Sequence, residues 1–135
     1  MIGLDTNVLA RYLAQDDVAQ AAMATRLIET KLSTHQPGFI SVVVIAELCW
    51  VLSRLYSASM DELIEMLEDL LNTPQFQVER REVVQAAIRR FKTGSKRKTG
   101  VVDALIAQIA ESEGCTHTVT FDRAAVRGAG MTLLS

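Results

Sequence analysis

The sequence has few of the features that mark secreted or disulfide-stabilised proteins. It contains only two cysteines, Cys49 and Cys115, which lie far apart and form no metal-binding motif. A disulfide framework is therefore excluded, and we expect two buried thiols in a reducing compartment. Neither a basic segment nor the apolar core of a signal peptide follows Met1, so we expect a cytoplasmic protein.

Long apolar runs and strong net charge are also missing. The longest apolar run, from Phe39 to Leu52, has 14 residues and includes Ser41 and Glu47, so it is too short and too polar to cross a bilayer. The net charge of −2 gives no strong overall attraction to nucleic acid or anionic membrane, and any polyanion site must come from local charge placement. The sequence offers no Ser-His-Asp order, no Cys-His pair and no glycine-rich phosphate loop.

What remains is the composition of one folded domain. The chain has 135 residues, of which 49% are apolar and 22% are charged, and we expect a single domain over residues 1–135. Only two prolines and seven glycines occur, which suits a helix-rich chain.

Short strand-like runs alternate with longer segments of helical periodicity. Strands are expected at 1–4, 38–40, 76–78, 117–121 and 131–134. Helices are expected at 6–14, 18–31, 82–92 and 101–113, and another begins at the capping box Ser59–Glu62 and ends before Pro74. This alternation predicts the α/β class, with a short and mostly parallel sheet flanked by helices.

Acidic residues stand at the carboxyl ends of two predicted strands, where open α/β sheets place their working sites. Asp5 ends the first strand and Asp122 ends a later one. Glu47 lies in the helix that follows the strand at 38–40 and is the only charge in the long apolar run. Asp103 lies in the first turn of the helix that opens near Gly100.

Each of these four residues also has a purely structural interpretation. Asp5 and Asp122 precede helices and could be only N-caps, each worth about 1 kcal/mol. Asp103 could be only a first-turn carboxylate that the helix dipole favours. Glu47 could be a residue that extends to the edge of an apolar face, where a charge costs several kcal/mol unless it is paired.

Taken together, the four carboxylates favour a metal site. If the helix N-termini converge on one sheet edge, the carboxylates share a pocket, repel one another and have raised pKa values. Mg²⁺ resolves this conflict because it prefers carboxylate and water oxygens as ligands. Such an ion lowers the pKa of a bound water and polarises phosphodiester oxygens, and either one or two ions are compatible with the sequence.

The same residues resemble those of the PIN-domain nucleases, and in particular the VapC-type toxins of toxin–antitoxin pairs. The resemblance spans nearly the whole chain. It rests on Leu4-Asp5-Thr6-Asn7-Val8-Leu9, on Glu47 within Val-Ile-Ala-Glu-Leu-Cys-Trp-Val-Leu, on Asp103-Ala-Leu-Ile-Ala and on Thr118-Val-Thr-Phe-Asp122-Arg. The order Asp, Glu, Asp, Asp at these spacings is the specific part of the pattern.

The resemblance implies a PIN-like three-layer fold and a Mg²⁺- or Mn²⁺-dependent endoribonuclease that acts on single-stranded or looped RNA, with metal-activated water attacking the phosphorus. The catalytic and metal-binding roles fall on four acidic residues, Asp5, Glu47, Asp103 and Asp122. Thr6 and Thr120 match positions where a polar residue supports the metal or the phosphate. The resemblance also implies an antitoxin that inhibits the enzyme by occupying the acidic site, and a homodimer, because such toxins are commonly dimers.

One position departs from the family pattern. Many relatives carry a further Asp three residues before the position of Asp103, where this chain has Gly100. The departure bears on the charge of the site and on a second metal, and it motivates an alternative, a PIN-like binding module that has lost activity. A further alternative, a metal-dependent phosphatase or phospho-acceptor domain that uses Asp5, requires an acid pair at the first strand and a Lys at a late strand end, and the sequence offers neither clearly.

A basic segment precedes Asp103. Residues 89–98 contain six of the 14 Lys and Arg residues of the chain and no acid. Within it, Lys96, Arg97 and Lys98 could hold RNA phosphates at the rim of the pocket, or could belong to a solvated loop. Trp50, on the Glu47 helix, could belong to the core or to a dimer patch.

Overall fold

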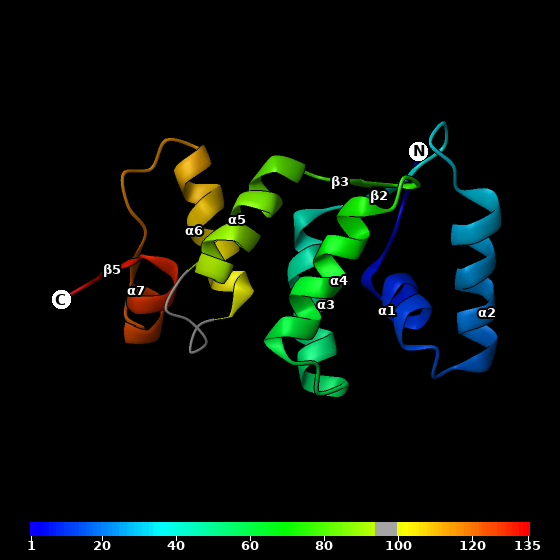
Figure 1. Cartoon of the computed structure of the whole chain (residues 1–135), viewed down its shortest axis with the longest axis horizontal. Coiled ribbons are helices and arrows are strands. Elements are labelled where there is room, and N and C mark those ends of the chain that lie inside the picture. Colours follow the sequence, from blue (N-terminus) through cyan, green and yellow to red (C-terminus); the bar gives the residue numbers. More distant parts are fainter. Residues whose placement is uncertain (94–99) are drawn as a thin grey trace. The chain divides into compact units, whose positions relative to one another are not determined.

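The computed structural model describes residues 1–93 and 100–135, and the chain divides into two compact units, Met1–Glu79 and Arg80–Ser135. Each unit contains short parallel strands and helices (Figure 1). Lys96, Arg97 and Lys98 fall outside the described residues. The single domain expected over residues 1–135 stays a prediction.

The first unit contains a three-stranded parallel sheet. Its strands are β1 (Ile2–Gly3), β2 (Gly38–Ile40) and β3 (Phe76–Val78), in the order β1-β2-β3. Gly38, the first residue of the middle strand β2, pairs with Ile2 of β1 and with Phe76 of β3. A Cβ at Gly38 would lie 2.7 Å from Leu4 Cδ1 and 2.8 Å from Leu32 Cδ1, so a larger residue here would require these leucine side chains to shift.

Four helices and one π-helical turn complete this unit. They are α1 (Thr6–Ala14), α2 (Val18–Arg26), η1 (Leu27–Lys31), α3 (Val42–Leu55) and α4 (Met60–Asn72). The helix expected over 18–31 is therefore an α-helix only as far as Arg26. Its last five residues wind more widely, and the N–H of Leu32 donates to the carbonyl of Leu27 at 3.0 Å.

Local capping sets where these helices begin. Asp17 accepts a hydrogen bond from the backbone N–H of Gln20 at the start of α2. Ser59 and Glu62 form the expected capping box at the start of α4, and backbone hydrogen bonding at Ser59 lowers the pKa of Glu62. The helix then ends at Asn72, before Pro74, as expected.

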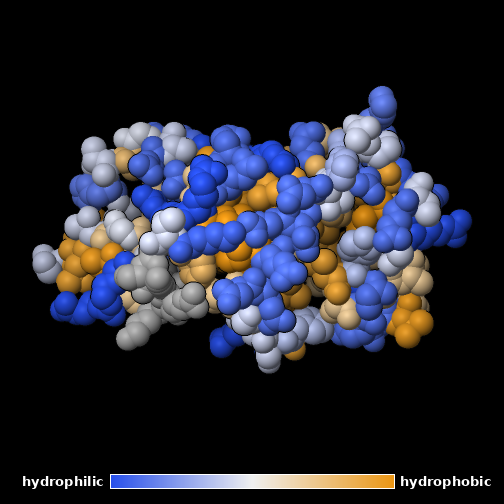
Figure 2. Space-filling model, viewed as in Figure 1, coloured by the Kyte–Doolittle hydropathy of each residue, from blue (hydrophilic) through white to orange (hydrophobic). Residues whose placement is uncertain are grey.

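Helix α3 has one buried side and one exposed side. Ile45, Leu48 and Leu52 are buried in the core, together with the Cys49 thiol, whose pKa burial raises to about 12. Apolar side chains are also exposed among the hydrophilic residues of the surface shown in Figure 2. The long apolar run is thus a core-facing helix with additional apolar residues on its outer side.

In its described residues, 80–93 and 100–135, the second unit has three helices and two strands. These are α5 (Arg81–Thr93), α6 (Val101–Ser112), β4 (Val119–Thr120), α7 (Arg123–Ala129) and β5 (Thr132–Leu133). The two strands are parallel, with Val119 paired to Thr132. Gly114 follows α6 with a φ of 94°, a left-handed conformation that glycine adopts without strain and that fits its expected place at the helix end.

The two units confirm the expected strand and helix positions, with shorter strands at the chain ends. The expectation of two buried thiols is wrong for Cys115, which is exposed because it lies in the loop after α6. None of the helices in the described ranges is long and apolar enough to cross a membrane.

Candidate functional site

Asp5 follows the carboxyl end of β1 and occupies the N-cap position of α1. Its backbone is extended, with φ −79° and ψ 157°, as an N-cap requires, but its side chain makes no capping hydrogen bond. The residue is exposed. The expected N-cap position of Asp5 is therefore confirmed, but its carboxylate makes no contribution to capping.

Thr6 and Glu47 are joined although 41 positions separate them in the sequence. The hydroxyl of Thr6, which is only 3% exposed, donates a 2.5 Å hydrogen bond to Oε1 of Glu47. Thr6 is the first residue of α1, so this bond links the start of α1 to the middle of α3. The structure thereby places Thr6, a predicted supporting residue, in contact with Glu47, a predicted catalytic residue.

Glu47 lies on the exposed side of α3, away from the core. Glu47 is exposed, and so are two apolar neighbours on its side of α3, Val43 and Trp50. The alternation of core and surface residues along a helix explains this, because α3 packs its other side into the core. Glu47 therefore carries its charge at the surface of the first unit without a large desolvation cost.

Glu79 is a residue that the sequence analysis missed. Its Oε1 accepts a 2.9 Å hydrogen bond from the backbone N–H of Val42, and Ser41 Oγ accepts one of 3.1 Å from Val44. Together these bonds satisfy two of the free N–H groups at the start of the helix that carries Glu47. The available signal was its place directly after the predicted strand at 76–78, the same place that drew attention to Asp5 and Asp122.

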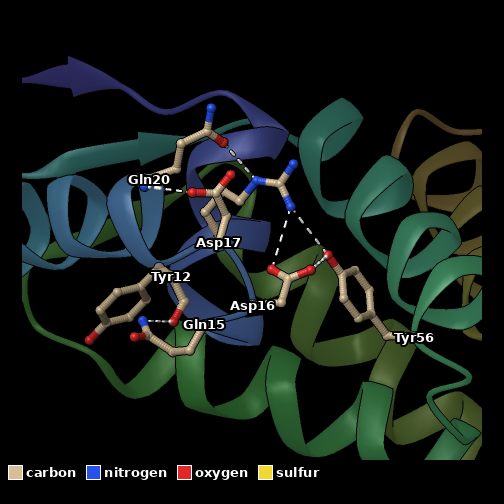
Figure 3. Close-up of polar contacts among 7 residues, drawn as sticks. Tyr12, Gln15, Asp16, Asp17, Gln20 and Tyr56 are labelled. Atoms are coloured by element: carbon tan, nitrogen blue, oxygen red, sulfur yellow. Dashed lines mark hydrogen bonds and ion pairs between the residues drawn. The ribbon is translucent and has the colours of Figure 1, made fainter.

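A second polar cluster joins the segment after α1 to Tyr56, the C-cap of α3. Asp16 and Tyr56 point toward each other in Figure 3, and the Tyr56 hydroxyl donates to Asp16 Oδ2 at 2.8 Å. Arg11 Nη1 lies 3.4 Å from Asp16 Oδ1, and Arg11 Nε donates a 2.8 Å hydrogen bond to Gln20 Oε1. The Tyr56 hydrogen bond is the main reason why the pKa of Asp16 is lowered. These contacts, with the Thr6–Glu47 bond, fix the position of α1 against α3.

The second unit holds the other two carboxylates. Asp122 caps α7, with Oδ1 accepting from the backbone N–H of Ala124 at 2.9 Å, so its N-cap role is confirmed. The backbone N–H of Asp122 in turn donates to Thr120 Oγ1 at 3.0 Å. Thr120 therefore holds the backbone of Asp122.

Asp103 lies in the first turn of α6, as expected, and is half-buried. Burial is the main cause that raises the pKa of Asp103, and the negative charge of Asp122 raises it further. These two carboxylates thus form an electrostatically coupled pair of like charge. A bound cation would relieve such repulsion and favour the ionised form of Asp103.

The donor set fits a hard divalent cation, because every candidate ligand is a carboxylate. Each unit supplies two of the four, and neither unit by itself gathers three His, Cys, Asp or Glu side chains around a metal position within the described ranges. Mg²⁺ is commonly bound by only one or two protein carboxylates and retains several waters. A carboxylate pair in one unit is therefore compatible with such an ion.

A cavity of about 330 Å³ lies between α1 and α2 of the first unit. Its lining is mainly apolar and comes from Asn7, Val8, Arg11, Gln20, Met23, Ala24 and Leu27. None of the four candidate carboxylates lines it, so this cavity and the carboxylates are separate features.

Parallel strands flanked by helices define an α/β protein, and Asp5 and Asp122 each follow one of these strands. The chain matches the PIN domain over residues 2–130, and it belongs to that family. Over 120 residues it is 28% identical to a VapC ribonuclease from Aquifex aeolicus (strain VF5), covering 89% of this chain and 86% of that protein. The resemblance drawn from the sequence and the PIN-like α/β fold class are thereby confirmed.

Proposed function

We propose that this chain is a metal-dependent endoribonuclease, the toxin component of a toxin–antitoxin pair, and that it hydrolyses RNA phosphodiesters. The observation that carries the proposal is the membership of the PIN-domain family, combined with carboxylates at the positions that the family pattern uses. The similarity to a VapC ribonuclease supports the substrate class and the toxin role.

Four acidic side chains are the proposed catalytic and metal-binding residues, Asp5, Glu47, Asp103 and Asp122. Their oxygen donors suit Mg²⁺ or Mn²⁺, and the like-charge coupling between Asp103 and Asp122 gives the pair a reason to bind a cation. When bound, such an ion supplies a water of lowered pKa and polarises the phosphodiester oxygens.

The residues of the chain itself have distinct tasks in this proposal. Thr6 orients Glu47 through its hydroxyl, so that the carboxylate keeps one direction at the surface of α3. Thr120 accepts a hydrogen bond from the backbone N–H of Asp122 and so restricts the backbone position from which the Asp122 carboxylate extends. Phosphate binding by Lys96, Arg97 and Lys98 is proposed from their charge and their place in the sequence just before α6.

The same proposal includes partners and location. An antitoxin protein would inhibit the enzyme by occupying the acidic site, and the chain would act as a homodimer in the cytoplasm. The similarity to a VapC ribonuclease supports the antitoxin partner.

The decisive experiment is cleavage of a mixed RNA substrate by purified protein with Mg²⁺, with Mn²⁺ and with EDTA. Asp103→Asn and Asp5→Asn should each reduce the rate by at least about 100-fold, since a catalytic group typically contributes 10²–10⁴-fold. Glu65→Gln, at an exposed position of α4, is the matched control and should cleave like the wild type. Equal cleavage by Asp5→Asn and wild-type protein, both free of contaminating nuclease, would contradict the assignment.

A catalytically silent binding module is the second candidate, and Gly100 favours it. Gly100 is the N-cap of α6 and offers no side chain there, where many relatives have a further acid. This candidate predicts that no RNA is cleaved with either metal and that partner binding survives loss of Glu47 and Asp122. Calorimetric titration with Mn²⁺ separates the two functions, because metal binding lost in Asp103→Asn supports the nuclease.

A further inference from the structure

The exposed side of α3 that carries Glu47 also carries an aromatic ring and a guanidinium group. Residues spaced by four, three and four positions lie on one face of a helix. On α3 these are Val43, Glu47, Trp50 and Arg54, and all four are exposed. The face therefore combines two charges and one large flat side chain.

Trp50 and Arg54 form a pair on this face. The guanidinium carbon of Arg54 lies 5.6 Å from the centroid of the Trp50 ring, within the range of a cation–π interaction. Trp50 nevertheless remains 56% exposed, so part of its ring is open to a ligand. The contact with Arg54 restricts the ring before any ligand arrives, which lowers the entropy cost of binding.

The chemistry of this pair matches a nucleotide. An exposed aromatic ring stacks on an unpaired base, and a nearby Arg binds the adjoining phosphate. Trp50 lies three residues beyond Glu47, which is a rise of about 4.5 Å along the helix axis. A base stacked on Trp50 would therefore be held within one helical turn of a proposed catalytic carboxylate.

We propose that Trp50 and Arg54 are substrate-positioning residues that bind an unpaired base of the RNA and its phosphate beside Glu47. The inference rests on the proposed function and adds the residues that hold the substrate on the first unit. A positive charge lies over the ring on this face, and this pairing suits a base–phosphate ligand better than the apolar surface of a protein partner. Bases in a duplex have their faces covered by stacking, so the site selects single-stranded or looped RNA.

Trp50 provides its own probe, because it is the only tryptophan in the chain. We would titrate the protein in EDTA, where a metal-dependent enzyme cleaves nothing, with a short single-stranded RNA and with the same sequence as a duplex. The expected result is saturable quenching of Trp50 emission by the single strand, with at least about 10-fold weaker response to the duplex. Equal response to both, or no quenching at saturating RNA, overturns the proposal.

Variants test the same assignment through kinetics. Stacking on an aromatic side chain is worth about 1–3 kcal/mol, so Trp50→Ala should raise KM about 5- to 100-fold with little change in kcat. Trp50→Phe should recover most of this loss, because a smaller ring still stacks. Arg54→Gln should raise KM and weaken its dependence on salt, since one phosphate contact is removed. Leu55→Ala, 68% exposed on a neighbouring face of α3, is the matched control and should leave KM unchanged.

The outcomes separate this inference from the proposed function. Unchanged KM in Trp50→Ala overturns the assignment, and a change from dimer to monomer in that variant assigns the face to contact between copies of the chain. Absence of cleavage by the wild type, together with quenching by single-stranded RNA in EDTA, removes the nuclease but keeps the binding site. Cleavage that requires Asp5 but is indifferent to Trp50 and Arg54 keeps the nuclease and removes the binding site.

Discussion

Removing Thr6 and removing Glu47 from the hydrogen bond between them should cost different amounts of stability. Thr6 is buried and Glu47 is exposed, so the two partners differ in what remains when the other is removed. Thr6→Val leaves a carboxylate that water can solvate, whereas Glu47→Ala leaves a buried hydroxyl without its acceptor. Net loss of a typical hydrogen bond costs about 0.5–1.5 kcal/mol, and an unsatisfied buried polar group costs about 1–3 kcal/mol.

We therefore expect Glu47→Ala to lower the free energy of unfolding by about 1–3 kcal/mol and Thr6→Val by about 0.5–1.5 kcal/mol. The double variant has no buried hydroxyl that could be left without an acceptor. Its decrease in the free energy of unfolding should therefore be smaller, by about 1 kcal/mol, than the sum of the decreases in the two single variants. Thr6→Ser keeps the donor and should couple to Glu47 like the wild type.

Urea unfolding followed by far-ultraviolet circular dichroism measures these differences, because α1 and α3 contribute strongly to the helical signal. Equal slopes of free energy against urea across the variants are needed for the comparison. Single losses that add within about 0.3 kcal/mol would refute the reasoning, since independent sites behave that way. A larger loss in Thr6→Val than in Glu47→Ala would refute the asymmetry.

Three further predictions concern other parts of the chain. Burial and the charge of Asp122 raise the pKa of Asp103, so the folded chain holds that proton more tightly than the unfolded chain does, and stability falls as pH rises from the unfolded to the folded pKa. Asp103→Asn should therefore raise the thermal midpoint at pH 7 without metal, and this gain should vanish below about pH 4, where the Asp103 carboxyl is protonated in both states. An unchanged midpoint at pH 7 would contradict this. Ser59→Ala removes a capping-box partner and should cost about 1 kcal/mol in urea unfolding, whereas a loss below about 0.3 kcal/mol would contradict the box geometry. A thiol reagent should label Cys115 rapidly in the native protein and Cys49 only after unfolding, because Cys49 is buried with a pKa of about 12; two fast thiols would contradict this.

Sequence periodicity was sufficient for the local structure. The strands at Gly38–Ile40 and Phe76–Val78 and the helix at Thr6–Ala14 have the expected bounds, because alternation, helical spacing and capping residues are short-range signals. The wider winding after Arg26 has no such signal.

The candidate site shows where local signals stop. Asp5 and Asp122 look alike in the sequence, each directly before a helix, yet only Asp122 makes a capping bond. The Thr6–Glu47 bond depends on how α1 and α3 pack, over a separation of 41 residues. Hydropathy placed Glu47 in an apolar face because the run of apolar residues continues around the whole helix. Which half of that helix is buried is decided by its neighbours.

The two sides of helix α3 differ in how strongly packing constrains their residues. The inward residues Ile45, Leu48 and Leu52 are constrained by packing, so that most substitutions there weaken the fold. The outward residues Val43, Trp50 and Arg54 carry little packing and can be exchanged at small cost in stability. If Trp50 and Arg54 bind RNA as proposed, a lineage could change which RNA it prefers by altering one side of a single helix, while the carboxylate on that side and the core behind it stay the same.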